Sequence, residues 1–323
     1  MRTRELGGAT VAAVGAGDVS LARAAARGVD AGEVAHALHE ALDRGLDVVD
    51  VACEDAAERL AGDAVRALRL RDRAVVACRV PALTGGRDVL PERLPPRHVQ
   101  ARVEAALRAT RLDPLPLAIV EVRAAWRDSP AWPELRGTCA RLGHEGKVMR
   151  WGLALDAPDD AAPLVEPEWL AALRVPWSVC ERAMDPVIAL ALERGIAVLA
   201  ARPLAGGALA GAIGPGVRLA PGDDRRALDP RQLEAIAVGV AKLAALVKRE
   251  PPAARSCHAA RAQLERNPRA ERLALTVAEL ALRAAIDRGA IALPRLHRRE
   301  HLAEAISAGA APPLDLDLAA LDI

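Results

Sequence analysis

Residues 31–51 read AGEVAHALHEALDRGLDVVDV and contain the unit that repeats along the chain. Val34, Leu38 and Leu42 recur at the spacing of one helix face, and the pattern ends before Gly45, a residue type that commonly follows a helix. The next six residues, 46–51, are mostly apolar and predict a buried strand. The segment therefore predicts an amphipathic helix that leads directly into a strand.

Similar strands and helices are expected along the whole chain. The strands are nearly all apolar, as strands covered on both faces should be, and lie at residues 11–14, 46–51, 74–80, 117–122, 148–153, 175–179, 196–200 and 290–293. Helical patterns occupy residues 31–44, 56–69, 98–111, 131–142, 187–194 and 277–288. Repeated strand-then-helix units with eight strands predict an α/β fold of the (β/α)8 TIM barrel class, with residues 1–323 as a single domain.

Residues 228–272 do not fit this repeat. Residues 228–250 predict a long helix with Asp229 as its N-cap and Pro230 as its first helical residue, and residues 251–272 are polar and rich in arginine. The segment falls between the seventh strand and its helix, so it emerges at the C-terminal face of the barrel, where active sites of this fold lie. It is either a surface excursion, or a lid or contact between copies of the chain.

The composition limits the kinds of partner. Lys+Arg 44 against Asp+Glu 43 gives a net charge of +1, which offers no general attraction to nucleic acid or acidic membranes. No apolar stretch reaches membrane-spanning length, and the first residues do not fit a signal peptide. We expect a cytoplasmic protein that acts on a small molecule, with no nucleic-acid or membrane partner. A homo-oligomer is left open.

Metal sites and disulfides are not expected. The five cysteines are scattered and include no CxxC pair. His297 and His301 are four residues apart, but no third ligand is evident. We therefore predict no metal.

Gly15 and Gly17 follow an apolar run and suggest part of a dinucleotide-binding fingerprint. Ser20 stands where the third glycine of that fingerprint belongs, and no second βαβ half is evident. A Rossmann fold is therefore a weak alternative to the barrel.

Several motifs resemble a known family when they are taken in order. They are Arg4-Glu-Leu-Gly7, ALDRGLDVVDVA at residues 41–52, ERLAG at 58–62, GKVMRWG at 146–152, ERGIAVLAARPLAGGALAG at 193–211, VAELALR at 277–283 and ALP at 292–294. Their order and spacing from residue 2 to about residue 313 resemble the aldo-keto reductase superfamily. The resemblance implies a (β/α)8 barrel whose relatives bind NADPH and reduce carbonyl groups.

The resemblance also implies positions for the family's catalytic Asp, Tyr, Lys and His. The Asp matches Asp50, and the Tyr falls at Asp55 or Glu54 in a chain without tyrosine or phenylalanine. The Lys matches Arg79 and the His matches Glu121. We expect Asp50, Arg79 and Glu121 to form a carboxylate–guanidinium–carboxylate cluster that holds a polar substrate and moves protons. The alternative is that the cluster only neutralises buried charge.

Cofactor positions are partly retained in the same comparison. The loop that cradles pyrophosphate in relatives is matched by Pro203, Leu204, Gly207, Leu209 and Gly211, and Arg298 and Arg299 stand where relatives bind a 2′-phosphate. The Ser-Asn pair, the Gln and the stacking Tyr that hold nicotinamide are matched by Ala154-Leu155, Trp177 and Cys180. The cofactor is therefore left unknown, with NADPH implied only by the resemblance. Trp126, Trp177 and Cys180 are expected to line the substrate pocket.

The sequence is compatible with three functions. The first is a small-molecule enzyme of specialised metabolism that uses the Asp/Arg/Glu pocket for proton transfer, as a lyase, dehydratase, cyclase or isomerase would. The second is an NAD(P)H-dependent oxidoreductase with Asp55, Glu54 or water as its proton donor. The third is a non-catalytic binding or scaffold protein.

Overall fold

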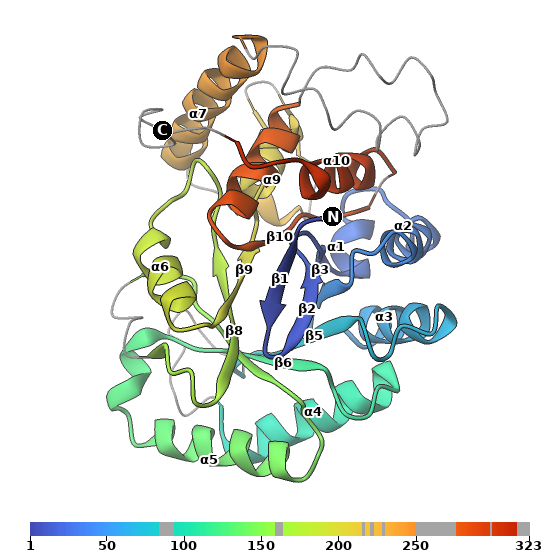
Figure 1. Cartoon of the computed structure of the whole chain (residues 1–323), viewed down its shortest axis with the longest axis vertical. Helices are drawn as coiled ribbons and strands as arrows, with labels where there is room; N and C mark the ends of the chain where they lie inside the picture. The colour runs from blue at the N-terminus through green and yellow to red at the C-terminus, as the bar shows by residue number, and fades with distance from the viewer. Residues whose placement is uncertain are drawn as a thin grey trace.

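Eight parallel strands form the centre of the molecule in the computed structural model, which describes residues 1–83, 94–158, 164–214, 217–219, 223–227, 230–249, 276–297 and 299–314 (Figure 1). Each strand pairs with the next one along the chain, in the order β3 (Ala16–Val19), β4 (Val48–Val51), β5 (Val75–Val80), β6 (Leu117–Glu121), β7 (Trp151–Ala154), β8 (Leu170–Pro176), β9 (Ala197–Ala201) and β10 (Ile291–Leu293). The ring of strands is closed by a parallel bridge between Val14, just before β3, and Ala292 of β10. The predicted (β/α)8 barrel is confirmed.

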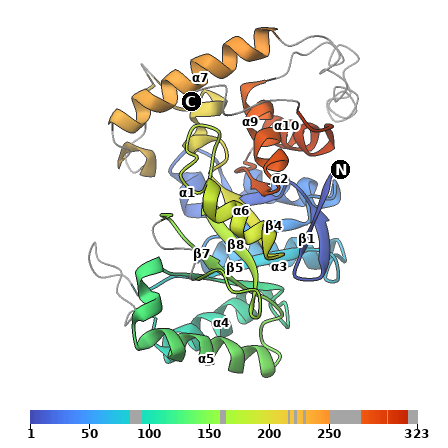
Figure 2. The ribbon, with the colours of Figure 1, turned by 60° about the vertical axis from the view of Figure 1, so that its left-hand side comes forward.

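Helices cover the outside of this barrel (Figures 1 and 2). They are α1 (Leu21–Ala25), α2 (Ala31–Asp43), α3 (Asp55–Ala67), α4 (Pro96–Thr110), α5 (Ala131–His144), α6 (Asp185–Glu193), α7 (Pro230–Arg249), α9 (Val277–Asp287) and α10 (Arg299–Ala310). The six helices predicted from periodicity all occur within a few residues of their expected bounds. Apolar spacing located them because their buried faces pack on the strands.

The predicted first strand, residues 11–14, was wrong. Those residues overlap an antiparallel hairpin of β1 (Thr3–Leu6) and β2 (Ala9–Ala12), and the first barrel strand is β3. Leu6 and Val11 of the hairpin are fully buried against the inward residues at the start of the barrel strands, such as Val48 and Val75. The hairpin therefore closes the N-terminal end of the barrel, and only the opposite end is available for a site.

Gly15 and Gly17 contact the last barrel strand and the residues after it, rather than forming a phosphate-binding turn. Their amides donate hydrogen bonds of 2.9 and 2.8 Å to the carbonyl oxygens of Ala292 and Pro294. A Cβ atom on Gly17 would overlap the carbonyl oxygen of Leu293. The glycines let the first and last strands approach each other, so the Rossmann alternative is excluded.

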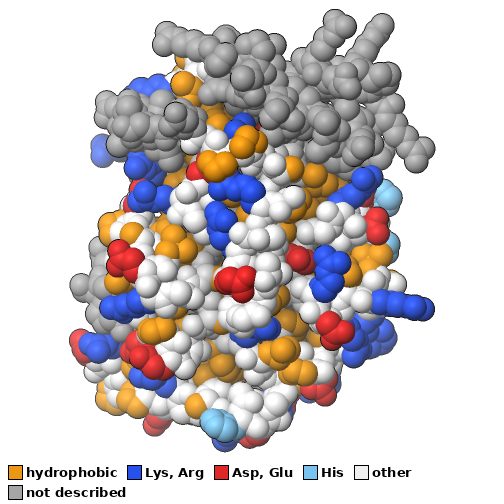
Figure 3. Space-filling view, in the orientation of Figure 1, with side chains coloured by type: hydrophobic (Ala, Val, Ile, Leu, Met, Phe, Trp, Pro, Cys, Tyr) orange, Lys and Arg blue, Asp and Glu red, His pale blue; other side chains and the backbone are white. Residues whose placement is uncertain are grey.

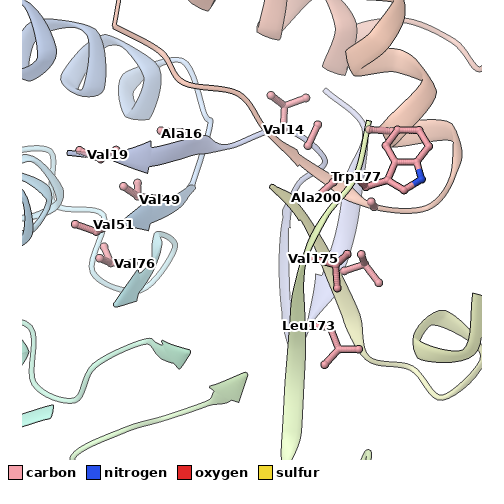
Figure 4. Packing of buried hydrophobic residues seen from close by; sticks show 14 of the residues in the cluster. Val14, Ala16, Val19, Val49, Val51, Val76, Leu173, Val175, Trp177 and Ala200 are labelled. Atoms are coloured by element: carbon pink, nitrogen blue, oxygen red, sulfur yellow. The ribbon is translucent and has the colours of Figure 1, made fainter. Parts of the chain in front are cut away.

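Side chains alternate between the barrel interior and the helix-facing side of each strand. On β4, Val48 belongs to the interior cluster, whereas Val49 and Val51 pack outward (Figure 4). On β8, Ala172 points inward and Leu173 and Val175 pack outward, as does Trp177 directly after the strand (Figure 4). The same alternation sends Asp50 and Arg174 toward the interior at the C-terminal end of their strands.

The long predicted helix is present as α7, and its first residue is Pro230 as expected. Both ribbon views place α7 at the same end of the molecule as α9 and α10 (Figures 1 and 2). Asp229 and residues 251–272 lie outside the described residues, so the expected N-cap and the role of that segment stay predictions. No helix in the described part of the chain is long and apolar enough to cross a membrane.

Replacing Gly17 with alanine tests the closure. We expect Gly17→Ala to lower the free energy of unfolding by about 2–3 kcal/mol, because the new Cβ meets backbone that cannot easily move. Urea unfolding followed by circular dichroism measures the change. The matched control is Gly137→Ala on the exposed side of α5, where a Cβ has nothing within 4 Å and alanine should add about 0.5–1 kcal/mol. Equal stability of the Gly17→Ala and wild-type proteins would contradict this account of closure.

Candidate functional site

A cavity of about 610 Å³ opens at the C-terminal ends of the barrel strands. Its walls come from residues at the ends of β3, β4, β5, β8, β9 and β10, from the 3₁₀ helix η4 (Ala205–Ala210), and from Ile236 of α7. The volume suits a metabolite or cofactor, and this end of a barrel is where such ligands bind.

Asp50 is the centre of the cavity floor. It is fully buried at the end of β4, and both of its oxygens accept hydrogen bonds from Arg79, at 3.0 Å from Nε and 2.8 Å from Nη2. Nε of Arg174 lies 3.2 Å from Oδ2, and the backbone amide of Asp18 lies 3.1 Å from the same oxygen. Burial alone would raise the pKa of Asp50, but Arg174 and Arg79 outweigh it and hold that pKa well below its usual range.

Asp18 extends the same network toward the mouth. Its carboxylate accepts hydrogen bonds from Arg79 at 2.7 Å, Arg23 at 2.5 Å and Arg295 at 2.8 Å. We call Asp18, Asp50 and the four arginines that bind them (Arg23, Arg79, Arg174 and Arg295) the arginine–carboxylate cluster. It joins residues from β3, β4, β5, β8, α1 and the segment after β10.

The cluster fixes the charge state of Arg79. Burial would lower the pKa of this guanidinium, but Asp50 and Asp18 raise it above its already high usual value. Arg79 therefore stays protonated around neutral pH. It can bind an anion or orient a carboxylate, but it cannot act as a proton donor.

Glu121 does not join the cluster that the sequence predicts. Its side chain is half-buried at the end of β6, it does not line the cavity, and no ion pair joins it to Arg79 in the described part of the chain. Asp18 is the second carboxylate on Arg79 instead. The expected carboxylate–guanidinium–carboxylate arrangement therefore exists with a different second acid.

The two residues expected at the tyrosine position face away from the cavity. Asp55 is exposed in the first turn of α3, where it pairs with Arg59. Glu54 accepts hydrogen bonds from the hydroxyl of Ser20 at 2.8 Å and the amide of Ala22 at 3.1 Å, so it holds the start of α1. Neither carboxylate lines the cavity.

The predicted cofactor loop lies partly on the cavity wall. Pro203, Leu204 and Gly207 line it, and Gly207 has a φ of 103°, which favours glycine. Leu209 is buried beneath the loop, and Gly211 ends η4 with a φ of 73°. Arg298 lies outside the described residues, and only the backbone of Arg299, the first residue of α10, is described.

The three predicted pocket walls are elsewhere. Trp177 is buried on the outer side of the barrel, where its indole Nε1 donates a 2.7 Å hydrogen bond to Asp185. Trp126 is buried in the 3₁₀ helix η2 (Ala124–Asp128). Cys180 is half-buried, and burial raises the pKa of its thiol to about 11. None of the three lines the cavity, and Arg174 and Pro176 provide the β8 wall in their place.

His297, considered from the sequence only as a metal ligand, lines the same cavity. Its imidazole is nearly buried, and its Nε2 has no hydrogen-bond partner among the described residues. Burial and the neighbouring Arg295 and Arg27 lower the pKa of His297 to about 4. The ring is therefore neutral near pH 7. Within the described residues, no group of three His, Cys, Asp or Glu side chains could hold a metal ion.

Breaking the Asp50 ion pairs should destabilise the fold. We expect Asp50→Asn to lower the free energy of unfolding by about 3 kcal/mol or more, because Arg79 and Arg174 lose the carboxylate that compensates their burial. Guanidinium chloride unfolding measures this. Asp55→Asn is the control, since the exposed Asp55–Arg59 pair should be worth less than about 1 kcal/mol. Similar stabilities for the two variants would show that the buried pairs do not hold the mouth together.

His297 should make stability depend on pH. An unfolded histidine binds a proton near pH 6.5, whereas folded His297 does so only near pH 4, so stability falls as the pH is lowered between these values. The full loss is about 3 kcal/mol, since one pKa unit corresponds to about 1.4 kcal/mol. His297→Gln should flatten the unfolding free energy between pH 6.5 and 4.5, and substitution of the exposed His36 should not. An unchanged pH profile in His297→Gln would refute this origin.

Comparisons with known proteins agree with the barrel fold. The sequence model of the Aldo/keto reductase family matches residues 13–322. No curated protein matches the chain. Among solved structures, an aldo/keto reductase from Klebsiella pneumoniae in complex with NADP and acetate is 23% identical with a TM-score of 0.65, covering 99% of this chain and 94% of that chain.

Two further structures are similar across the whole barrel. The glycerol dehydrogenase from Gluconobacter oxydans is 20% identical with a TM-score of 0.72, covering 99% of this chain and 94% of that one. An aldo-keto reductase from Bacillus halodurans in its holo form is 17% identical with a TM-score of 0.68, covering 97% and 92% of the two chains. At these identities the structures show the fold alone. Because the family match spans nearly the whole sequence, the chain belongs to the aldo/keto reductase family.

Proposed function

We propose that the chain is a small-molecule enzyme that keeps the aldo/keto reductase barrel, binds an anionic substrate at its mouth, and does not carry out tyrosine-dependent carbonyl reduction. The observation that carries the proposal is the arginine–carboxylate cluster. It stands at the strand ends where the family resemblance implies a tuned proton donor, and at its centre the neighbouring arginines lower the pKa of Asp50 while Asp50 and Asp18 raise the pKa of Arg79, so both groups stay charged.

The charge of the cavity favours an anion. Seven arginines and four acidic residues line it, and it includes no lysine among the described residues. Concentrated positive charge inside a concave, partly buried site attracts anions more strongly than the same charge on an open surface. On the outer face drawn in Figure 3, by contrast, basic and acidic side chains are interspersed.

The lining residues restrict the chemistry that remains. In the described part of the cavity wall there is no Ser, Thr, Cys, Tyr or Lys side chain, so a covalent nucleophile of those kinds is not at hand. Asp50 stays ionised and orients Arg79 and Arg174 rather than carrying protons. Proton exchange is left to lining residues outside the cluster, such as Glu181 and His297, which suits elimination or isomerisation of an anionic metabolite.

The cavity wall suits the phosphate groups of NADP but not its nicotinamide. The arginines and the loop of Pro203, Leu204 and Gly207 offer a setting for phosphate groups. At the strand ends, the described wall provides no amide or hydroxyl side chain to hold a carboxamide and no aromatic ring other than histidine, while Asp18 and Asp50 place two carboxylates there. We therefore assign no reaction step to a nicotinamide.

An NADP-dependent oxidoreductase is the second candidate, because the family match and the loop on the cavity wall both favour it. Binding of the cofactor separates the two functions. We expect no quenching of tryptophan fluorescence and no rise in melting temperature at millimolar NADPH, while small phosphorylated or carboxylated compounds raise the melting temperature. Saturable NADPH binding together with hydride transfer to a carbonyl would reject the first proposal in favour of the second.

The same assay with Arg174→Gln tests whether the pocket binds at all. A ligand that uses the cavity should lose at least tenfold in affinity, because removing a charged hydrogen-bonding partner costs about 1.5 kcal/mol or more. Arg141→Gln, an exposed arginine of α5, is the control. If no compound distinguishes the two variants, a non-catalytic scaffold becomes the better description. A homo-oligomer and a cytoplasmic location stay predictions.

A further inference from the structure

Arg202 is the residue directly after β9, on the rim of the cavity. Its side chain is exposed and lines the cavity between Ala201 and Pro203. It therefore projects from the C-terminal end of a barrel strand into the space that a ligand would fill, which is where catalytic and binding residues of this fold stand.

Arg202 differs from the other arginines that line the cavity in its side-chain partners. Arg23, Arg79 and Arg295 bind Asp18, Arg174 binds Asp50, and Arg225 binds Asp223 at 2.8 Å.

Arg27 also has an interaction, which makes six of the seven lining arginines engaged. Arg202 makes no ion pair and no hydrogen bond through its side chain with any residue that the structure describes. Its positive charge is available to a ligand, whereas five of the other six charges are partly compensated by Asp18, Asp50 or Asp223.

The backbone at Arg202 is held in an unfavourable conformation. Its φ is 57°, in the left-handed region that favours glycine, and arginine gains nothing locally from being there. The turn continues with Ala205 at a φ of 47° and then Gly206 and Gly207. Strained non-glycine residues concentrate at ligand sites, where the side chain has a function that glycine cannot supply.

We propose that Arg202 binds the anionic group of the substrate, a carboxylate or a phosphate, and holds it at the rim while the rest of the molecule lies in the cavity. This assignment deepens the proposed function and rests on it for the anionic nature of the substrate. The planar guanidinium matches either oxyanion through paired N–H donors. The apolar wall of Leu204, Ile236 and Leu293 is available to the uncharged part of the same molecule.

Arg202→Gly separates a binding role from a structural one. Glycine relieves the left-handed backbone, so the unliganded variant should melt at a slightly higher temperature than the wild type, while the cation is lost. Arg69→Gly is the matched control, because Arg69 is also an exposed arginine with a positive φ, at 56°, but follows α3 away from the cavity. Arg202→Lys keeps the charge and loses the paired donors.

Binding is measured by isothermal titration of the full-length protein with inorganic phosphate and, separately, with succinate. We expect the wild type and Arg69→Gly to bind at least one probe equally, Arg202→Gly to bind that probe at least tenfold more weakly, and Arg202→Lys to lie between them. A preference for phosphate or for succinate identifies which oxyanion the rim accepts.

Three results overturn the assignment. They are undiminished binding by Arg202→Gly, no binding of either probe by the wild type, and a lower melting temperature of unliganded Arg202→Gly, which would make Arg202 a structural residue. Failure of the proposed function is distinguishable from these. NADPH-dependent hydride transfer by the wild type would reject the proposed function, yet a selective loss of probe binding in Arg202→Gly would still support the role of Arg202.

Discussion

A fully buried carboxylate at the end of β4 constrains the whole mouth of the barrel. Asp50 has no access to water, and an ionised carboxylate in that position is tolerated only if cations and hydrogen-bond donors surround it. Arg79 and Arg174 supply them from the neighbouring β5 and from β8 across the barrel. Arg79 also donates a hydrogen bond to Asp18, and Asp18 accepts another from Arg295 in the segment after the last strand. Each buried charge is therefore balanced by an oppositely charged residue from another strand end, and these pairs connect the strand ends around the mouth.

Helical periodicity and apolar runs were enough to predict the barrel, because each helix and strand buries one regular face. The hairpin of β1 and β2 was missed because its apolar residues, such as Val11, are as buried as those of a barrel strand. Gly15 and Gly17 suggested a phosphate-binding turn. The structure shows instead that the absence of side chains there lets β10 lie close to the start of β3. Local patterns do not reveal which distant strand a glycine must approach.

The candidate site was predictable in part. Asp50 and Arg79 lie together because both are inward residues at the ends of adjacent strands. Applying the same alternation to β8 would have selected Arg174 and placed Trp177 outside, whereas matching by family motif selected Trp177. Asp18 was not predictable, because it adopts a left-handed φ of 48° where the regular alternation of β3 ends. That Arg202 has no side-chain partner among the described residues likewise depends on tertiary contacts that sequence does not specify.

The barrel is the fold of the aldo/keto reductase family, whereas the charged residues at the strand ends distinguish this chain. Seven lining arginines are compatible with one fold because they lie at the open C-terminal end of the strands, where carboxylates pair with most of them, above an apolar interior of Val48, Val75, Leu117 and similar residues. The residues at the strand ends can therefore change, and with them the chemistry of the site, while the apolar barrel interior preserves the fold. This separation explains how sequences that are 17–23% identical to this chain can share its architecture.

The hairpin that closes the lower end of the barrel has a kinetic consequence. With Leu6 and Val11 packed into that end, a molecule in the cavity arrives and departs through the same opening. Anything that narrows this opening adds the same barrier to both directions of passage, so it slows association and dissociation by the same factor and leaves the equilibrium constant unchanged. Residues at the rim that do not touch the bound molecule, on α7 for example, can therefore change its residence time without changing its affinity, which the residues inside the cavity set.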